Sequence, residues 1–298
     1  MIDIPITTII GLEKGENPVV KFQTKILNSA TDHRIRLLFP THLKTDKVIV
    51  NGHFGVHYRN IGTPNGKGWV KPPETTFPFH KFIAIWDQEK KRGLGIFTKG
   101  LPEYEAFYSN DGEVTIALTL FRSTSRWGRH IGVNPPVHTP RALLYNQEMA
   151  FEYAIMPLNQ PWDDKSTPDH LKIYRLAEEY WTSLQWEEYY DTFRYKTNFN
   201  DRLLPLSNEF LKIEPANVIL STLKIVETEP KGILLRIYNI LHENSKCTLI
   251  FNSKLKSVTF CDLKENALLN QPNFSIAENI LEFEIGSAKI ITIKINLV

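Results

Sequence analysis

The chain has 298 residues, of which 42% are hydrophobic and 23% charged, and its 35 basic and 33 acidic side chains leave a formal net charge of +2. A chain of this length can bury a sizeable core, and the composition is typical of a folded protein. The scattered, balanced charge excludes nucleic acid as an expected partner. No apolar run approaches the ~20 residues of a membrane helix, so a membrane is excluded as well.

Apolar and polar side chains alternate along most of the chain, which is the pattern of half-buried β-strands. The alternation is regular over 113–121, 148–156 and 291–297. Turn-forming residues such as Asn110-Asp111-Gly112 separate the candidates, as an antiparallel fold requires. Further strands are predicted at 22–27, 34–39, 47–51, 82–86, 93–97, 233–240, 248–251 and 281–285.

Helix is scarce, and the best candidate covers residues 168–184, where Pro168 and Asp169 can start a helix with an apolar stripe. A polar, irregular stretch at 198–201 precedes a new series of short strands. We therefore predict an all-β protein with a larger domain over 1–202 and a small β-sandwich over 203–298.

The cysteines and the amino terminus indicate the cellular compartment in which the protein is expected. Cys247 and Cys261 could form a disulfide, but two thiols in a chain this long are more typical of a reducing compartment. The first residues lack the basic and apolar regions of a secretory signal. The sequence therefore predicts a cytoplasmic protein.

Catalytic patterns are not recognisable. Glu103 and Glu105 could be offered as a glycosidase carboxylate pair, but a surface or hydrogen-bonded turn is the preferred interpretation. His53 and His57 are four positions apart within a β pattern, which is unsuited to a helical pair of zinc ligands. We expect no metal site, and no nucleophile elbow or phosphate loop occurs.

Six segments, in order along the chain, resemble motifs of the family-38 α-mannosidases and the related mannosylglycerate hydrolases. They are NSATDHRIRLLFP at 28–40, GLPEYE at 100–105, ALTLFRS at 117–123, FEYAIMP at 151–157, PANVILSTLK at 215–224 and LLRIYN at 234–239. The resemblance implies a galactose-mutarotase-like β super-sandwich, incomplete at its N-terminal edge, followed by a small β-sandwich.

The resemblance also implies that this chain lacks the catalytic domain of the family. In the family the zinc ligands and the nucleophilic Asp lie in an N-terminal barrel, to which nothing in this chain corresponds. We therefore expect no catalytic residue and no cofactor in this chain, with zinc belonging to the barrel. The expected partners are an α-mannoside and either a separate catalytic chain or a second copy that covers the exposed sandwich edge. A split enzyme and a truncated gene product both remain open as the origin.

In this family the loop after the 117–123 strand lends side chains to the rim of the sugar pocket. The resemblance thus marks Arg122, Arg126 and Trp127 as substrate-binding residues, because arginine forks bind hydroxyls and indole faces stack on sugars. A structural ion pair of Arg122 at the sandwich edge is an equally open alternative. Arg129 and His130 make the loop more basic than the family pattern, and Asp32-His33-Arg34 is interpreted as structural.

Three functions are consistent with the sequence. The first is the non-catalytic C-terminal part of an α-mannosidase, which scaffolds hydrolysis of terminal α-mannosides by a barrel on another segment or chain. The second is a free-standing carbohydrate-binding module that uses Trp69, Trp86 or Trp127. The third is an isomerase of the aldose-epimerase type, suggested by fold alone.

Overall fold

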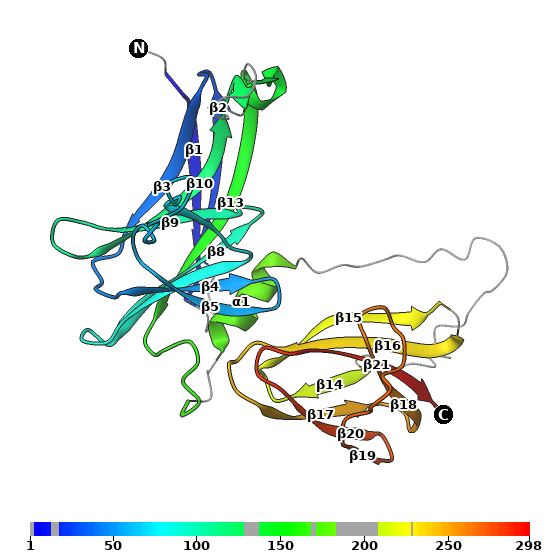
Figure 1. Cartoon of the computed structure of the whole chain (residues 1–298). Coiled ribbons are helices and arrows are strands. Elements are labelled where there is room, and N and C mark those ends of the chain that lie inside the picture. The colour runs from blue at the N-terminus through cyan, green and yellow to red at the C-terminus, as the bar shows by residue number, and fades with distance from the viewer. Residues whose placement is uncertain (1–2, 13–17, 128–136, 168–170, 183–207, 228) are drawn as a thin grey trace, which may run out of the picture. The chain divides into compact units, whose positions relative to one another are not determined.

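Antiparallel strands make up nearly all the regular structure of the computed structural model (Figure 1). The structure describes residues 3–12, 18–127, 137–167, 171–182, 208–227 and 229–298. The chain divides into two compact units, one comprising Met1–His53 and His57–Ser183 and the other Phe54–Val56 and Leu184–Val298. The all-β class is as predicted, while the predicted boundary between 202 and 203 lies outside the described residues.

The larger unit contains a sheet of seven strands. Its order is β1 (Ile6–Leu12), β2 (Val20–Asn28), β13 (Gln147–Leu158), β8 (Arg92–Lys99), β7 (Phe82–Asp87), β4 (Lys47–Gly52) and β5 (Gly55–Asn60).

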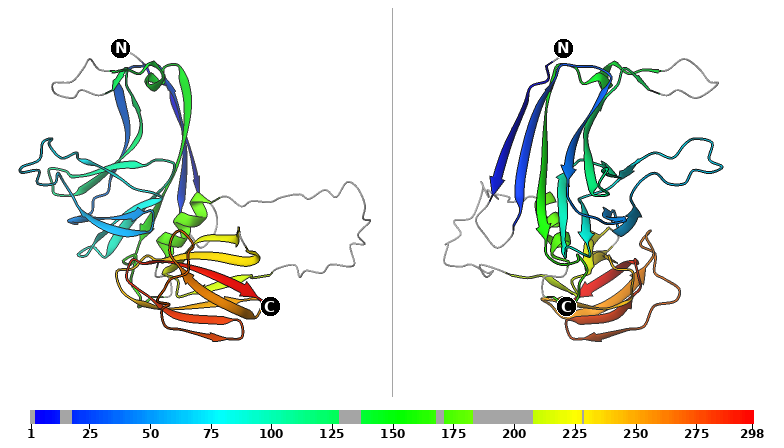
Figure 2. Two further views of the ribbon diagram at one scale, coloured as in Figure 1. Left: turned by 45° about the vertical axis from the view of Figure 1, so that its right-hand side comes forward. Right: turned by 90° about the vertical axis from the view of Figure 1, so that its left-hand side faces the viewer.

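A second sheet faces it, with the order β3 (His33–Pro40), β10 (Val114–Ser123), β9 (Glu103–Tyr108) and β6 (Thr76–Pro78) (Figure 2). A short ribbon of β11 (Arg126–Trp127) and β12 (Val137–His138) and a 3-10 turn, η1 (Pro140–Leu143), follow β10.

The core of the larger unit lies between these two sheets. Ile26, Ile83 and Ile96 from the seven-stranded sheet belong to the same buried cluster as Ile116 and Leu118 from the opposite sheet. One face of each strand supplies these side chains, and this burial on one side causes the period-two alternation in the sequence. The strand predicted over 148–156 is confirmed as β13, whose apolar residues pack on this cluster.

Helix α1 (Lys172–Trp181) covers the outer face of the seven-stranded sheet. Its Tyr174 ring meets Phe82 edge-on, with ring centroids 6.0 Å apart. Gly95 on β8 makes room for the helix, because a Cβ there would lie 2.6 Å from Cδ1 of Ile173. Strand β7 is therefore buried on both faces, and its apolar run does not alternate. The predicted helix is confirmed, with described bounds shorter than 168–184.

The smaller unit is a sandwich of two four-stranded sheets. One has the order β14 (Leu211–Glu214), β17 (Ser245–Phe251), β20 (Ile280–Ile285) and β19 (Phe274–Ala277). The other has the order β15 (Val218–Val226), β16 (Glu229–Asn239), β21 (Ile290–Leu297) and β18 (Leu255–Cys261). Their inner faces share one apolar cluster that includes Leu235, Leu249, Phe283 and Ile293, so the strand predicted over 291–297 is confirmed.

None of the described helices is both long and apolar enough to cross a lipid bilayer.

Candidate functional site

Arg122 lies at the end of β10, on the outer face of the four-stranded sheet. A β-bulge between Thr119 and Phe121 inserts one extra residue into β10 opposite β3. Beyond the bulge Phe121 turns toward the core, where it is 7% exposed, and Arg122 turns outward with a side chain that is 50% exposed. The bulge thus aims the guanidinium of Arg122 at the neighbouring strand β9.

There Arg122 meets Glu103. Its Nη2 donates a hydrogen bond of 2.7 Å to Oε1 of Glu103, and the Thr119 hydroxyl donates to the same oxygen. Burial alone would raise the pKa of Glu103, but Thr119, Arg122 and Arg34 outweigh it and hold that pKa below its ordinary value. Glu103 is therefore a carboxylate at neutral pH.

Glu105, two positions along β9, shares this face. Arg36 on β3 donates to its Oε2, and Nη2 of Arg34 lies 3.6 Å from the same atom. Strand β10 runs between β3 and β9, and its small Ala117 and Thr119 let the longer side chains meet above it. We call this set the Arg–Glu network; its members are Arg34, Arg36, Glu103, Glu105 and Arg122.

The structure shows the surroundings of Glu103 and Glu105, the carboxylate pair that the sequence offers as a catalytic candidate. Glu103 and Glu105 share a strand face, as positions i and i+2 must, but arginines bind both of them. A general acid needs a proton to give at working pH, and the lowered pKa of Glu103 works against that role. The structural interpretation of the pair is favoured.

The other predicted binding residues lie in the ribbon that follows. Arg126 pairs with His138 and is exposed, and Trp127 pairs with Val137; the side chain of Trp127 is outside the described part. Asp32 anchors the ribbon, since its carboxylate accepts the N–H of Ser125 at 2.7 Å. That hydrogen bond also lowers the pKa of Asp32, so Asp32 is structural as interpreted. Arg129 and His130 fall outside the described residues.

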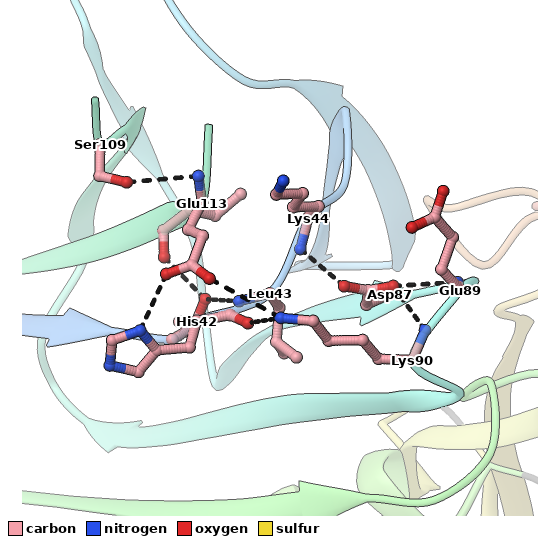
Figure 3. A network of polar contacts seen from close by, with 10 residues as sticks. His42, Leu43, Lys44, Asp87, Glu89, Lys90, Ser109 and Glu113 are labelled. Atoms are coloured by element: carbon pink, nitrogen blue, oxygen red, sulfur yellow. Dashed lines mark hydrogen bonds and ion pairs between the residues drawn. The ribbon is translucent and has the colours of Figure 1, made fainter. Parts of the chain in front are cut away.

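A second polar network joins the loop after β3 to the β7–β8 hairpin and the start of β10 (Figure 3). Asp87 is 1% exposed and accepts the backbone N–H groups of Lys44 at 2.8 Å and of Glu89 and Lys90 at 2.9 Å. These bonds lower the pKa of Asp87 although burial opposes them. The carboxylate fixes the hairpin turn and the neighbouring loop together.

Glu113 completes this second network. His42 Nδ1 lies 2.8 Å from Oε2 of Glu113, Nζ of Lys90 lies 3.7 Å from its Oε1, and Nζ of Lys90 also donates to the His42 carbonyl (Figure 3). The hydrogen bond from His42 is the largest cause of the lowered pKa of Glu113. No motif in the sequence marks this network, because an Asp at the start of a tight hairpin turn signals the turn and not the burial of its carboxylate.

A hollow of about 530 Å³ lies beside the second network. Its lining includes the apolar Leu38, Phe39, Leu94 and Ile155 and the cationic Lys90 and Arg92. The nearby carboxylates of Glu113 and Asp87 are held by their neighbours, so the hollow offers apolar surface and positive charge. Such a lining is suited to binding a small molecule and has no carboxylate poised for proton transfer.

Two tryptophans and the two cysteines are the remaining candidates for functional residues. Trp69 is 60% exposed, whereas Trp86 is 9% exposed within β7, which removes Trp86 as a sugar platform. Cys247 and Cys261 are free and buried, and burial raises the pKa of Cys247 to about 12. Over the described ranges, no three His, Cys, Asp or Glu side chains gather in a way that could hold a metal ion.

The fold and these networks define a protein of antiparallel β-sandwiches whose clustered carboxylates are engaged in ion pairs. Residues 217–293 match the family of the glycosyl hydrolases family 38 C-terminal beta sandwich domain. The predicted resemblance to the C-terminal region of the family-38 enzymes is thus confirmed.

Two kinds of relatives extend this match. Over 158 residues, 52% of this chain, the sequence is 31% identical to a protein of Halalkalibacterium halodurans provisionally named as a mannosylglycerate hydrolase. The fold resembles an α-mannosidase of Enterococcus faecalis V583 with a TM-score of 0.69 and 22% identity over 97% of this chain. A second structure from Enterococcus faecalis, of a family-38 glycosyl hydrolase, gives a TM-score of 0.68 at the same identity. The chain spans only 16% of the first relative, and 28% and 29% of the solved chains.

Proposed function

We propose that this chain is the non-catalytic C-terminal part of an α-mannosidase. In this proposal it scaffolds the hydrolysis of terminal α-mannosides by a zinc-dependent barrel that belongs to another segment or chain. The observation that carries the proposal is the match of 217–293 to the family-38 C-terminal sandwich domain. The name of the Halalkalibacterium halodurans relative supports mannosylglycerate as one member of the substrate class.

Zinc is assigned to the barrel in this proposal. A zinc site requires three or four converging His, Cys or carboxylate ligands. The described part of the chain offers no such group of three, and Cys247, which is fully buried with a raised pKa, is unsuited to metal binding. The proposed contribution of the chain is therefore to shape the substrate pocket.

Arg122 is the proposed substrate contact, with Arg126 and Trp127 beside it. Glu103 engages Nη2 of Arg122, and a guanidinium has five N–H donors, so donors remain for sugar hydroxyls. Glu103 thus orients the side chain of Arg122, which remains 50% exposed. This arrangement combines the two alternatives for Arg122, since an ion pair can orient a binding group.

The proposed partners are an α-mannoside and a catalytic chain or a second copy of this chain. Two free, buried cysteines support a reducing, cytoplasmic location, because exported proteins commonly pair their thiols.

Two activity measurements test the proposal. The isolated chain, incubated with an aryl α-mannoside and Zn²⁺, is expected to release no aglycone. When it is co-expressed with a family-38 barrel polypeptide, for instance one encoded by a neighbouring reading frame, the two should co-purify and hydrolyse the substrate. Turnover by the isolated chain would reject the proposal. A barrel polypeptide that is fully active alone and does not bind this chain would reject it as well.

A carbohydrate-binding module is the second candidate, and the 60% exposed Trp69 is the observation that favours it. An exposed indole can stack on a sugar face without any catalytic group. Calorimetric titration of the isolated chain with mannose and methyl α-mannoside separates the two functions. Saturable binding that is lost in Trp69→Ala would support the module, whereas heat of dilution alone favours the scaffold.

A further inference from the structure

The sequence contains two Asn-Gly dipeptides, Asn51-Gly52 and Asn65-Gly66, and the fold gives them different surroundings. Asn51 belongs to β4 and is 1% exposed. Asn65 lies in the loop between β5 and β6 and is exposed. Glycine has no Cβ, so the backbone nitrogen that follows each asparagine is little shielded and can attack the side-chain amide. Because both dipeptides carry the same reactive groups, the fold decides which of them can react.

The second dipeptide leads into a tight turn that needs its glycine. The carbonyl of Gly66 accepts the N–H of Trp69 at 2.9 Å, and Gly68 has a φ of +84°. The φ of Lys67 is not positive, so the turn is of type II with Lys67 and Gly68 at its centre. A Cβ on Gly66 would lie 2.4 Å from Cδ of Pro73. The packing of the loop therefore keeps a glycine in the dipeptide.

The side chain of Asn65 is folded over the backbone that follows it. The N–H of Lys67 donates to Oδ1 of Asn65 at 3.1 Å, which makes an Asx turn. The ring closed by this hydrogen bond contains both Cγ of Asn65 and the backbone nitrogen of Gly66, so these two atoms are held near each other. The same N–H points at the oxygen that gains negative charge when the nitrogen attacks Cγ. The loop thus positions both reacting atoms and stabilises the developing charge.

Asn51 is held in a different way. Its Oδ1 accepts the N–H of Lys81 at 3.1 Å, and its carbonyl accepts the N–H of His80 at 2.9 Å. These bonds tie the side chain to a segment 30 positions further along the chain, instead of to the backbone that follows Asn51. A reaction at Asn51 requires the side-chain bond to break and part of the buried sheet to open first.

We propose that Asn65 is a site of spontaneous deamidation, activated by the Asx turn, and that the fold protects Asn51. The proposal is independent of the proposed function. Hydroxide removes the proton from the backbone nitrogen of Gly66, which then forms a bond to Cγ of Asn65. The bond between Cγ and Nδ2 breaks, and ammonia leaves with a proton from water, which restores the hydroxide. Water finally opens the succinimide at either carbonyl and gives aspartate or isoaspartate at position 65.

Both products change the loop in a measurable way. Either one adds a negative charge and lowers the formal net charge of the chain from +2 to +1. Isoaspartate also inserts one methylene group into the main chain just before the turn that leads to Trp69, whose side chain is 60% exposed. The modification is therefore expected to move this exposed indole.

Incubation of the full chain at mildly alkaline pH, followed by peptide mapping with mass spectrometry, tests the proposal. The peptide that contains Asn65 should convert into two products in which OH replaces NH₂, and the peptide that contains Asn51 should persist. We expect a rate at Asn65 at least about 100-fold higher, because the reaction at Asn51 waits for the rare opening of a buried strand. An isoaspartyl methyltransferase with labelled S-adenosylmethionine should label only one of the two products.

The same chain unfolded in guanidinium chloride is the control for intrinsic reactivity. There the two dipeptides should react at similar rates, since both are surrounded by solvent. Equal rates at Asn65 and Asn51 in the folded chain, or no conversion at Asn65, would overturn the proposal. A rate ratio that is the same in the folded and the unfolded chain would overturn it as well.

Two variants test the role of the Asx turn. Asn65→Gln lengthens the side chain by one methylene group and should stop the conversion, because the attacking nitrogen would have to close a larger ring. Lys67→Pro removes the N–H that donates to Asn65, while proline suits the second position of a type II turn. It should slow the conversion roughly ten-fold, since one donor to the developing charge is lost. An unchanged rate in Lys67→Pro rejects the activation by the Asx turn.

Discussion

Arg122 and Glu103 are 19 positions apart in the chain, yet Nη2 of Arg122 lies 2.7 Å from Oε1 of Glu103. The contact depends on three features of the sheet: the pairing of β10 with β9, the bulge in β10, and the small residues between the arginines and the glutamates. Among the predicted binding residues, Arg122 is the one whose side chain is described and ion-paired. The contact joins it to Glu103, a carboxylate that the sequence offers as a candidate catalytic group.

Replacing Arg122 separates a binding role from a structural one. In the assembled hydrolase, Arg122→Ala should lower kcat/KM by about 10-fold to 100-fold, because a hydrogen bond to a charged group contributes about 1.5–3 kcal/mol. The free energy of unfolding should change by less than about 1 kcal/mol, since the side chain is 50% exposed.

Arg175→Ala is the control for this substitution, because Arg175 is 66% exposed and also faces a glutamate, Glu179. It should alter neither quantity. Steady-state kinetics on an aryl α-mannoside and urea denaturation measure both. Unchanged kinetics in Arg122→Ala would remove the binding role and leave the ion pair as structural.

Asp87 should be important for stability. Asp87→Ala leaves three backbone N–H groups without their acceptor in a buried turn, and we expect a loss of about 2–4 kcal/mol. Asp164→Ala is the control, because the carboxylate of Asp164 accepts hydrogen bonds from the N–H and the hydroxyl of Ser166 in an exposed turn, so its removal should cost much less than that of Asp87. Urea denaturation followed by circular dichroism gives both values. Equal losses would contradict the account of the second network.

Acid should destabilise the larger unit through its lowered carboxyl pKa values. Folded Glu103 and Asp87 have pKa values below the ordinary 4.5 and 3.8, so the unfolded chain binds protons first as the pH falls. Their stabilisation is complete above about pH 5 and is lost as the pH falls through the folded values. Urea midpoints measured between pH 7 and pH 3 should show this decline. Glu103→Gln should make the decline shallower, and an identical slope would show that Glu103 takes no part.

In the smaller unit, Asn239 is fully buried and joins three segments. Its Nδ2 donates to the carbonyls of Glu243 at 2.7 Å and Gly286 at 3.1 Å, and its Oδ1 accepts from Asn217 at 2.8 Å. Asn239→Ala would leave buried carbonyls and an amide unsatisfied and should cost about 2–4 kcal/mol. The exposed Asn244, when replaced by Ala, should cost less than about 1 kcal/mol. Thermal melts of the two variants that coincide would contradict this difference.

The sequence predicts the strands well wherever one face is buried. The alternation over 148–156 and 291–297 reappears as β13 and β21, because burial on one side is what produces a period of two. Over 113–121 the pattern correctly marks a strand but misses the bulge. Leu120 and Phe121 are both buried, and an apolar residue beside another apolar residue does not reveal which of them is the inserted one.

The networks were harder to predict than the strands. Glu103 and Glu105 are evident in the sequence, but their arginines come from β3 and β10, and a single sequence does not give the strand order or register. Asp87 was missed for a different reason: a lone Asp in a polar turn resembles any exposed turn residue until its burial is known.

The close approach of Gly95 and Ile173 has a consequence for how relatives of this chain can change. A methyl group at position 95 would lie within 2.6 Å of the end of the isoleucine. Helix α1 can keep its distance from β8 only if an added carbon on the strand is matched by a carbon removed from the helix. Among relatives that keep this helix, the two positions are therefore expected to vary together, with alanine at 95 accompanied by valine or a smaller residue at 173.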